Sequence, residues 1–288
     1  MNLRISEFNI KLNGDFDDRT ILSLKNYEVS EFEGNIDLEI TYISDDNIVL
    51  NKNEFIGPYK MWYFKETEFG FEMAKFADGV DNALSHVIMD TNKGIATFKN
   101  WDISSLINRE LYYMLFFGIS EIYSYFILNK DAIMFHSSSI IYNDKGICFS
   151  GKSGTGKSTH TSLWKKYYDV EVLNDDSPTL KINDDGVYAC GSPFAGSTGI
   201  NTNKVVPLKG IVFLEQAKEN SIKKLSQKEA YLRFFNETKK PVMKNYIQKT
   251  IDIFGKIYAS VPMYVLSCNI SKEAVDLVIK TLECENNA

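Results

Sequence analysis

The chain has 288 residues, a formal net charge of −6 at pH 7, 44% hydrophobic residues and 24% charged residues. These proportions are typical of soluble globular proteins, and they exclude a wholly disordered chain and a fibrous repeat. The length suits one large α/β domain or two domains of about 150 residues each. Because a broad nucleic-acid-binding face needs many cations, the acidic balance argues against nucleic acid as a partner. A small anionic ligand in a local site is still allowed.

The cysteines indicate a reducing compartment. They are scattered along the chain without the close pairs that zinc or dithiol chemistry needs. We therefore expect reduced, mostly buried thiols in a cytoplasmic protein rather than a disulfide framework. The four are Cys148, Cys190, Cys268 and Cys284.

Neither a secretory signal nor a membrane span is expected. The first twelve residues include Arg4, Glu7 and Lys11 where a signal peptide needs an apolar run. The segment from Leu111 to Leu128 is long and apolar, but it contains Glu121, which is costly inside a bilayer. We interpret this segment as a buried core helix, and no membrane partner is expected.

Residues 1–130 are predicted to form a β-rich accessory region that ends in a long helix. The expected helix runs from about residue 103 to 129, and Asp102 is its candidate N-cap, since a carboxylate accepts the free amide hydrogens of a first turn. This region contains no glycine loop, metal-ligand cluster or nucleophile–base pattern, so we expect it to pack on or cover a site elsewhere. Strands are expected in the runs Ile5–Leu12, Leu38–Ile43, Met61–Met73, His86–Met89 and Ile95–Trp101, where alternating, β-branched or aromatic residues recur.

Residues 131–288 change to alternating strands and helices, which predicts an α/β domain. The runs Phe135–Tyr142 and Ile147–Ser150 flank Asn-Asp-Lys-Gly, a turn sequence, so they predict a hairpin. Further strands are expected at Val170–Asn174, Pro178–Ile182, Val187–Cys190, Gly210–Leu214 and Met263–Ser267, and helices at Thr159–Tyr168, Gln227–Phe235, Lys244–Tyr258 and Lys272–Cys284.

A glycine-rich loop follows the predicted hairpin directly. Residues 151–158 read Gly-Lys-Ser-Gly-Thr-Gly-Lys-Ser, an unbroken match to the phosphate-binding pattern G-x-x-x-x-G-K-[ST] between a strand and a helix. The glycines let loop amides turn toward phosphate oxygens, and the helix N-terminus adds partial positive charge. Lys157 would then reach the β and γ phosphates, and the Ser158 hydroxyl would hold Mg²⁺. The expected nucleotide contacts are Gly151, Ser153, Gly154, Thr155, Gly156, Lys157, Ser158 and Thr159.

Two adjacent carboxylates, Asp175 and Asp176, end the strand that returns after this helix. The carboxyl end of a strand beside the phosphate loop is where ligands bind in α/β sheets. One carboxylate could hold Mg²⁺ while the other accepts a proton from an attacking hydroxyl. The alternative is a solvated turn, which is how we interpret Asp184 and Asp185.

His136 is the third candidate, on the strand that opens the hairpin. A single histidine in a strand is usually a structural residue. Here the hairpin would lay its strand alongside the phosphate-loop strand, which favours a role in the site.

Together, His136-Ser137-Ser138, the hairpin, the loop at 151–159 and Asn174-Asp175-Asp176 resemble the kinase core shared by HPr kinase/phosphorylase and the phosphoenolpyruvate carboxykinases. The bacterial protein kinase has His-Ala-Ser, G-x-S-G-x-G-K-S and Asp-Asp in this order, and the carboxykinases have His-Cys-Ser, G-x-S-G-T-G-K-T and Asp-Asp. The resemblance implies a P-loop core with a mixed sheet and ATP with Mg²⁺ as cofactors.

The same resemblance implies roles for individual residues. His136 would neutralise the transferred phosphoryl group or touch the metal, beside Lys157. One of the paired aspartates would be the base. We assign the base to Asp175 and Mg²⁺ binding to Asp176 with Ser158, and the reverse assignment of the two aspartates stays open.

The chain also departs from both families. It has four arginines, whereas a carboxykinase is longer and grips oxaloacetate with arginines and lysines. The Leu-Glu-x-Arg-Gly segment of the bacterial kinase, which assists the metal, is replaced by Cys190–Gly196, and the C-terminal arginine loop is missing. The protein would therefore supply fewer ligands to the metal, and phosphorylation of HPr itself is not implied. The polar segment Gly191–Lys209 is either a substrate loop or an ordinary connection.

The leading hypothesis is an ATP-dependent phosphotransferase that places the γ-phosphate on a hydroxyl of a peptide or protein serine or of a small alcohol. Two alternatives stay open. One is a phosphoenolpyruvate carboxykinase-like enzyme, and the other is a nucleotide-binding regulator that turns over poorly. The sequence does not specify the hydroxyl-bearing acceptor or the oligomeric state.

Overall fold

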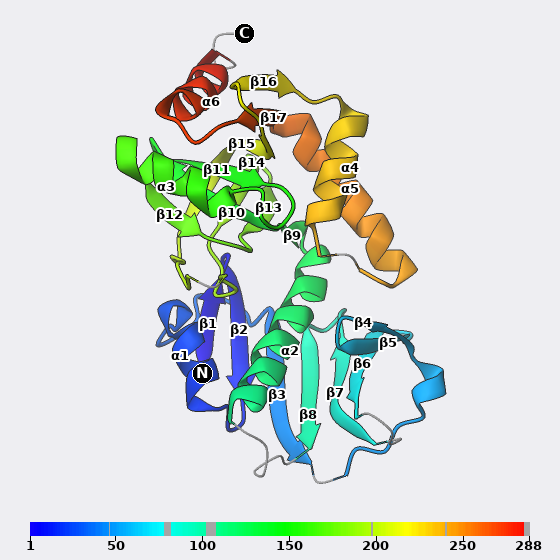
Figure 1. Ribbon diagram of the computed structural model, residues 1–288. Helices are drawn as coiled ribbons and strands as arrows, with labels where there is room; N and C mark the ends of the chain where they lie inside the picture. Colours follow the sequence, from blue (N-terminus) through cyan, green and yellow to red (C-terminus); the bar gives the residue numbers. More distant parts are fainter. Residues whose placement is uncertain (46, 78–81, 102–107, 197, 240, 285–288) are drawn as a thin grey trace. The chain divides into compact units, whose positions relative to one another are not determined.

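The computed structural model describes residues 1–45, 47–77, 82–101, 108–196, 198–239 and 241–284, and in residues 108–111 it describes the backbone (Figure 1). The chain divides into two compact units. Unit 1 consists of Met1–Lys130 and Pro241–Ile247, and unit 2 consists of Asp131–Lys240 and Gln248–Ala288. The sequence predicts one division, after residue 130, and it does not predict that Pro241–Ile247 belongs to unit 1.

Unit 1 is built on an eight-stranded mixed sheet. Its strand β3 pairs in parallel with both of its neighbours, β2 and β8, and the other adjacent strands are antiparallel. In sheet order the strands are β1 (Asn2–Ile5), β2 (Phe8–Asn13), β3 (Leu38–Asp45), β8 (Ile95–Trp101), β7 (Ala83–Asp90), β6 (Gly70–Phe76), β5 (Trp62–Glu66) and β4 (Ile56–Tyr59).

The β-rich composition of unit 1 is predicted well, but several boundaries are wrong. The run Ile5–Leu12 is two strands, because Ser6 and Glu7 have positive φ and form the turn between them. The run Met61–Met73 is also two strands, β5 and β6. The short helix α1 (Asp18–Leu24) was not predicted, although Asp17 caps it by accepting from the backbone amides of Arg19 and Thr20. Two short 3₁₀ segments, η1 (Lys25–Tyr27) and η2 (Lys52–Glu54), complete the unit.

The long helix of unit 1 is α2 (Asn108–Leu128), and it packs on the sheet (Figure 1). Its predicted start at residue 103 and the Asp102 cap lie outside the described residues. From Met114 onward the helix buries side chains on most of its surface, as expected for a core helix. Gly118 faces the ring of Phe98 on β8. Phe98 is fully buried, and its ring makes edge-on contacts with Tyr42 and Trp62.

Among the described residues, no helix has both the length and the apolar character that crossing a bilayer requires.

Unit 2 contains a nine-stranded mixed sheet, so the expected α/β class with a mixed sheet is present. The pairs β11–β15 and β15–β17 are parallel, and the other adjacent pairs are antiparallel. The strands are β9 (Ala132–Met134), β10 (Ser137–Tyr142), β11 (Lys145–Ser150), β12 (Glu171–Asn174), β13 (Thr179–Asn183), β14 (Gly186–Cys190), β15 (Val205–Gln216), β16 (Ser221–Lys224) and β17 (Met263–Cys268).

Helices cover both faces of the unit 2 sheet (Figure 1). Val212 and Leu214 of β15 point to one face, into a cluster with Trp164 of α3 and Val278 of α6. Phe213, between them in sequence, points to the other face, where Phe135 contacts it and stacks on Phe234 of α4. This alternation is the period-2 geometry of a strand buried on both sides. The helices are α3 (Lys157–Tyr167), α4 (Gln227–Glu237), α5 (Lys244–Ser260) and α6 (Lys272–Cys284), and α5 belongs to unit 2 from Gln248 onward.

The predicted hairpin is β10 and β11, which pair from Ser137 with Ser150 to Tyr142 with Lys145. Asn143 and Asp144 both have positive φ, as a two-residue hairpin turn requires. The strand predicted from Phe135 to Tyr142 is corrected by the structure, because it breaks at Phe135 and His136. β9 pairs with β13, whereas β10 pairs with β11 and β12, so the chain changes partners at this point. His136 therefore lies at a break rather than inside a strand.

None of the four cysteines, which all lie in the described part of the chain, forms a disulfide. Cys148 and Cys190 are buried, Cys268 is partly buried and Cys284 is exposed. Burial raises the pKa of the Cys148 thiol to about 12, so this thiol stays protonated at neutral pH.

Two helical glycines predict opposite responses to the same substitution. A Cβ on Gly118 would lie 2.4 Å from the Phe98 ring, whereas a Cβ on Gly255 of α5 would meet nothing within 4 Å. We expect Gly118→Ala to lower the free energy of unfolding by about 1–3 kcal/mol through overpacking. We expect Gly255→Ala to raise it by about 0.5–1 kcal/mol, because alanine favours a helix interior. Urea unfolding followed by circular dichroism measures both, and changes of the same sign would contradict this packing.

Candidate functional site

The glycine-rich loop connects β11 to α3. Gly154 has a φ of 80° and Gly156 a φ of 107°, conformations that residues with a side chain adopt at a cost. A Cβ at either position would meet nothing within 4 Å, so backbone conformation rather than space requires glycine here. Gly156 is the N-cap of α3, and no side chain caps this helix end. The first amides of α3 are therefore left for an external acceptor, which is the arrangement of phosphate-binding helix ends.

Lys157, the first residue of α3, points back across the loop. Its Nζ donates to the Gly151 carbonyl at 2.6 Å and lies 3.0 Å from Nε2 of His136. Burial lowers the pKa of the Lys157 ammonium, while the negative charges of Glu237 and Asp176 act in the opposite direction. The lysine is thus a half-buried cation with carboxylates nearby and no direct ion pair among the described residues.

His136 is held by backbone contacts on both sides. Its N–H donates to the Glu237 carbonyl at 2.7 Å, and its carbonyl accepts from Ser150 Oγ at 2.7 Å. Its Nδ1 lies 3.4 Å from Oδ1 of Asp176. Since an ammonium only donates, the Lys157 contact makes Nε2 an acceptor and leaves the ring proton on Nδ1, facing Asp176. The structure therefore brings Lys157, His136 and Asp176 into one line of contacts.

Asp176 is set in a tight turn built by Asn174. The buried Asn174 side chain accepts from the backbone amides of Asp176 at 2.8 Å and Ser177 at 2.6 Å, and it donates to the Ser192 carbonyl at 2.8 Å. Burial by itself would raise the pKa of Asp176, but contacts with His136, Ser177 and Lys157 outweigh it and hold the pKa below its usual value. Asp176 is therefore ionised at neutral pH.

Asp175 points to a different set of partners. Its Oδ1 accepts from the Gly196 amide at 2.7 Å, and its Oδ2 accepts from the Thr198 hydroxyl. Neither Lys157 nor His136 contacts this carboxylate among the described residues. The predicted acidic pair is thus divided, with Asp176 toward the phosphate loop and Asp175 toward the segment that follows β14.

Ser158 and Thr159 are exposed in the first turn of α3, and Ser153 is exposed in the loop. The structure records no contact between Ser158 and Asp176. A hydroxyl and an ionised carboxylate are the oxygen ligands that Mg²⁺ prefers, and this cation keeps water and substrate phosphates in its shell. These two residues therefore fit Mg²⁺ held through a nucleotide. No three His, Cys, Asp or Glu side chains of the described ranges gather into a protein-only metal site.

Two neighbours of the site were not predicted from the sequence. Gln216, the last residue of β15, donates from Nε2 to the carbonyls of Gly154 at 3.2 Å and Thr155 at 3.5 Å. β15 is the parallel neighbour of β11, so the carboxyl ends of both strands lie at the same end of the sheet. The sequence pattern of a parallel sheet could therefore have pointed to Gln216. Glu237 ends α4 and bonds to His136 through its backbone, a long-range contact without a local sequence signal.

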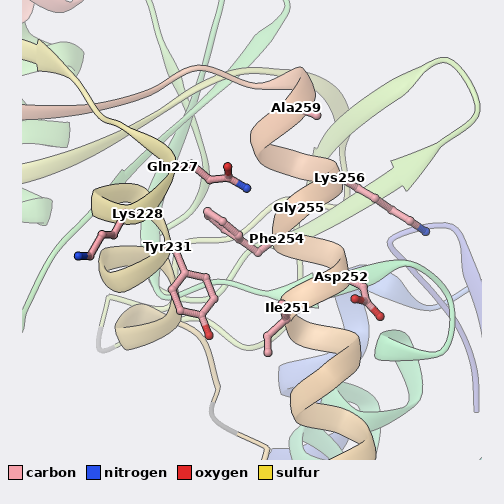
Figure 2. Close-up of a pocket in the computed structure, with 9 residues that line it drawn as sticks. All are labelled: Gln227, Lys228, Tyr231, Ile251, Asp252, Phe254, Gly255, Lys256 and Ala259. Atoms are coloured by element: carbon pink, nitrogen blue, oxygen red, sulfur yellow. The ribbon is translucent and has the colours of Figure 1, made fainter.

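A separate open hollow of about 790 Å³ lies between α4 and α5. Figure 2 shows Gln227 of α4 and the ring of Phe254 of α5 pointing into the space between the helices, with Lys228 pointing away from α5. Tyr231 packs edge-on against Phe254 at 5.3 Å. None of the predicted site residues lines this hollow.

The chain matches no protein-family model and no curated protein sequence. Among solved structures it is similar to the Hpr(Ser) kinase/phosphatase from Coxiella burnetii, with 13% sequence identity and a TM-score of 0.32. The similarity covers 54% of this chain and 90% of that chain.

We expect a change at Gln216 to weaken the nucleotide binding that the sequence of the loop predicts. In a trans peptide the carbonyl of one residue and the amide of the next point in opposite directions, so Gln216 also fixes the direction of the Gly156 N–H. Gln216→Leu removes this hold, and we expect the Kd for the fluorescent analogue mant-ATP to rise about three- to tenfold. Gln227→Leu, which alters a glutamine of the α4–α5 hollow, is the matched control. Equal Kd values for the two variants would contradict the assignment.

We expect the free energy of unfolding to fall at acidic pH because of His160. It is buried in α3 beneath the loop, accepts from Trp164 Nε1 at 3.2 Å and lies edge-on to Phe149. Burial lowers its pKa to about 4, so below pH 6.5 the unfolded chain binds a proton that the folded chain does not. The His160 contribution is fully present above pH 6.5, and we expect about 3 kcal/mol of it to be lost by pH 4. His160→Gln should flatten this part of a stability–pH curve measured by urea unfolding, and an unchanged slope would refute it.

Proposed function

We propose that this protein is an ATP-dependent phosphotransferase that moves the γ-phosphate of ATP to a hydroxyl, either of a serine in a peptide or protein or of a small alcohol. The observation that carries the proposal is the line from Lys157 through His136 to Asp176 beside the uncapped N-terminus of α3. It combines an anion-binding helix end, a cation and an ionised carboxylate within one site.

The residues divide the work by chemistry. The free amides of the loop and of α3 bind phosphate oxygens, and Lys157 reaches the β and γ phosphates by leaving the Gly151 carbonyl. His136 is positioned to meet the transferred group next to Lys157. Mg²⁺, held by Ser158 and one aspartate, would offset charge on the phosphates.

Transfer joins the acceptor oxygen to the γ-phosphorus and breaks the bond from that phosphorus to the β–γ bridging oxygen. The acceptor proton passes to a carboxylate of the Asp175–Asp176 pair, and ADP leaves. The pattern of His136, the 151–158 loop and the acidic pair is similar to that of HPr kinase/phosphorylase and the phosphoenolpyruvate carboxykinases, which supports this reaction class. HPr itself is not implied as the acceptor, because the segments that accompany that activity are absent from the sequence.

A radiolabel assay tests the function. The protein is incubated with γ-³²P-ATP, Mg²⁺ and a serine-containing peptide library or a set of small alcohols. We expect label on an acceptor. We expect the double variant that combines Asp175→Asn with Asp176→Asn to lose transfer while the Kd for mant-ATP stays within about threefold. Lys157→Ala should raise that Kd by at least about tenfold.

Other outcomes assign other functions. Nucleotide-dependent release of CO₂ from oxaloacetate would favour a carboxykinase-like enzyme. Tight binding of ATP without turnover on any acceptor would favour a nucleotide-binding regulator. Failure to bind ATP at all would overturn the proposal and both of these alternatives.

A further inference from the structure

We infer that Asp175 is a positioning residue: its carboxylate anchors the segment between β14 and β15, and this segment forms the acceptor side of the site. Asp176 is then the carboxylate of the pair that serves the transfer reaction. The anchoring is a statement about the chain itself, whereas the role of the segment in acceptor binding rests on the proposed function.

The hydrogen bonds of Asp175 carry the first step. Both carboxylate oxygens accept from the segment, one from the Gly196 amide at 2.7 Å and the other from the Thr198 hydroxyl. The Asp175 amide also donates, to the Ile200 carbonyl at 3.1 Å. Three contacts thus tie one aspartate to three positions of the same segment. The Asp175 carboxylate is therefore directed at the segment rather than at Lys157 and His136.

Hydrogen bonds close the base of the segment, whereas Thr198 is exposed to solvent. The Gly191 amide donates to the Lys204 carbonyl at 2.9 Å, which closes the base. The buried Ser192 donates from Oγ to the Ser177 carbonyl at 2.6 Å, and its own carbonyl accepts from the Asn174 side chain. The start of the segment is therefore held against the turn that contains the acidic pair.

The segment lies directly against both aspartates. A Cβ placed on Gly196 would be 3.1 Å from Cβ of Asp176 and 3.3 Å from Oδ2 of Asp175, so only glycine fits without a shift. Beyond this contact, Ile200 is 41% exposed, while its backbone carbonyl accepts a hydrogen bond from the Asp175 amide. An apolar side chain and a hydroxyl are therefore presented to solvent immediately beside the acidic pair, where an acceptor must approach.

The Asp176 carboxylate has neighbours on the phosphate-loop side. It faces His136 Nδ1 at 3.4 Å, and its charge is close enough to influence Lys157. Ser177 Oγ donates to its Oδ2 at 2.7 Å, and the segment makes no hydrogen bond to its carboxylate among the described residues. The side of the pair that faces the phosphate loop is therefore Asp176, which leaves Asp175 for the segment.

The test measures the segment and the chemistry separately. Amide hydrogen exchange, read by mass spectrometry on peptides covering residues 191–204, reports the anchoring and needs no nucleotide. We expect Asp175→Asn and Thr198→Val each to speed exchange there by about fivefold or more, and Asp176→Asn to leave it within twofold. Thr198→Ser, which keeps the hydroxyl, should restore slow exchange. Asp184→Asn, which changes an exposed turn carboxylate, is the matched control.

Hydrolysis of ATP by water, which needs no bound acceptor, reports the chemistry. We expect Asp176→Asn to lower it by more than tenfold and Asp175→Asn by less than threefold. With the serine-containing peptide library as acceptor, Thr198→Val should raise KM more than it lowers kcat.

Two results would overturn the inference: unchanged exchange of residues 191–204 in Asp175→Asn, or equal losses of ATP hydrolysis in Asp175→Asn and Asp176→Asn. Should Asp175→Asn not fold, Thr198→Val and Thr198→Ser decide the anchoring by the same exchange measurement. Absence of ATP binding in the unaltered protein would refute the proposed function while the exchange result still decides the anchoring, so the two failures are distinguishable.

Discussion

The pairing of β10 with β11 and β12 is the constraint on which the site depends. β10 is antiparallel to both neighbours, so its first residue lies at the same sheet edge as the last residues of the other two. Ser137 pairs with Ser150, and Ser139 pairs with Asn174. The residues just outside these pairs are His136, the loop that begins at Gly151, and the acidic pair. A slip of one residue in either register would send alternate side chains to the other face of the sheet and would separate His136 from the loop and the acidic pair.

Beneath this edge lies a buried polar layer rather than an apolar one. The hydroxyl of Ser138 meets that of Thr161 at 2.8 Å and thereby links β10 to α3, while Ser139 donates to the Asn174 carbonyl at 3.0 Å. Buried polar groups are stable when each has a partner, and a satisfied network fixes geometry more narrowly than packing does. The charged groups above this layer therefore lie on a rigid support, which would limit the reorganisation needed for the phosphate transfer that we propose.

The sequence predicts the parts of the site that depend on local chemistry. A glycine pattern between a strand and a helix, a turn sequence between two apolar runs, and two carboxylates after a strand each have a local physical cause, and the structure contains all three. The hairpin pattern predicts that His136 lies near the loop, because the two strands of a hairpin are adjacent. Its position at a strand break was not, because the exchange of strand partners depends on β13, which is remote in sequence.

The direction of a side chain at the end of a strand is decided by what packs on it. Asp175 and Asp176 look equivalent in the sequence, and only the fold of the segment after β14 separates them. Glu237 reaches His136 because Phe234 stacks on Phe135 at 4.7 Å, a contact that joins residues about a hundred positions apart. In unit 1 the missed turn at Ser6 and Glu7 has the same character, since neither residue type favours a positive φ without tertiary support.

The return of Pro241–Ile247 to unit 1 makes both units discontinuous along the chain. Tyr246 packs edge-on against Tyr125 at 4.9 Å and Phe71 at 6.2 Å, inside the aromatic core of that unit. A fragment that stops at Lys130 would lose this ring and leave two large aromatic side chains uncovered. One that begins at Asp131 would keep a seven-residue piece of its neighbour's core. Cutting the chain after Lys130 would thus give two incomplete units.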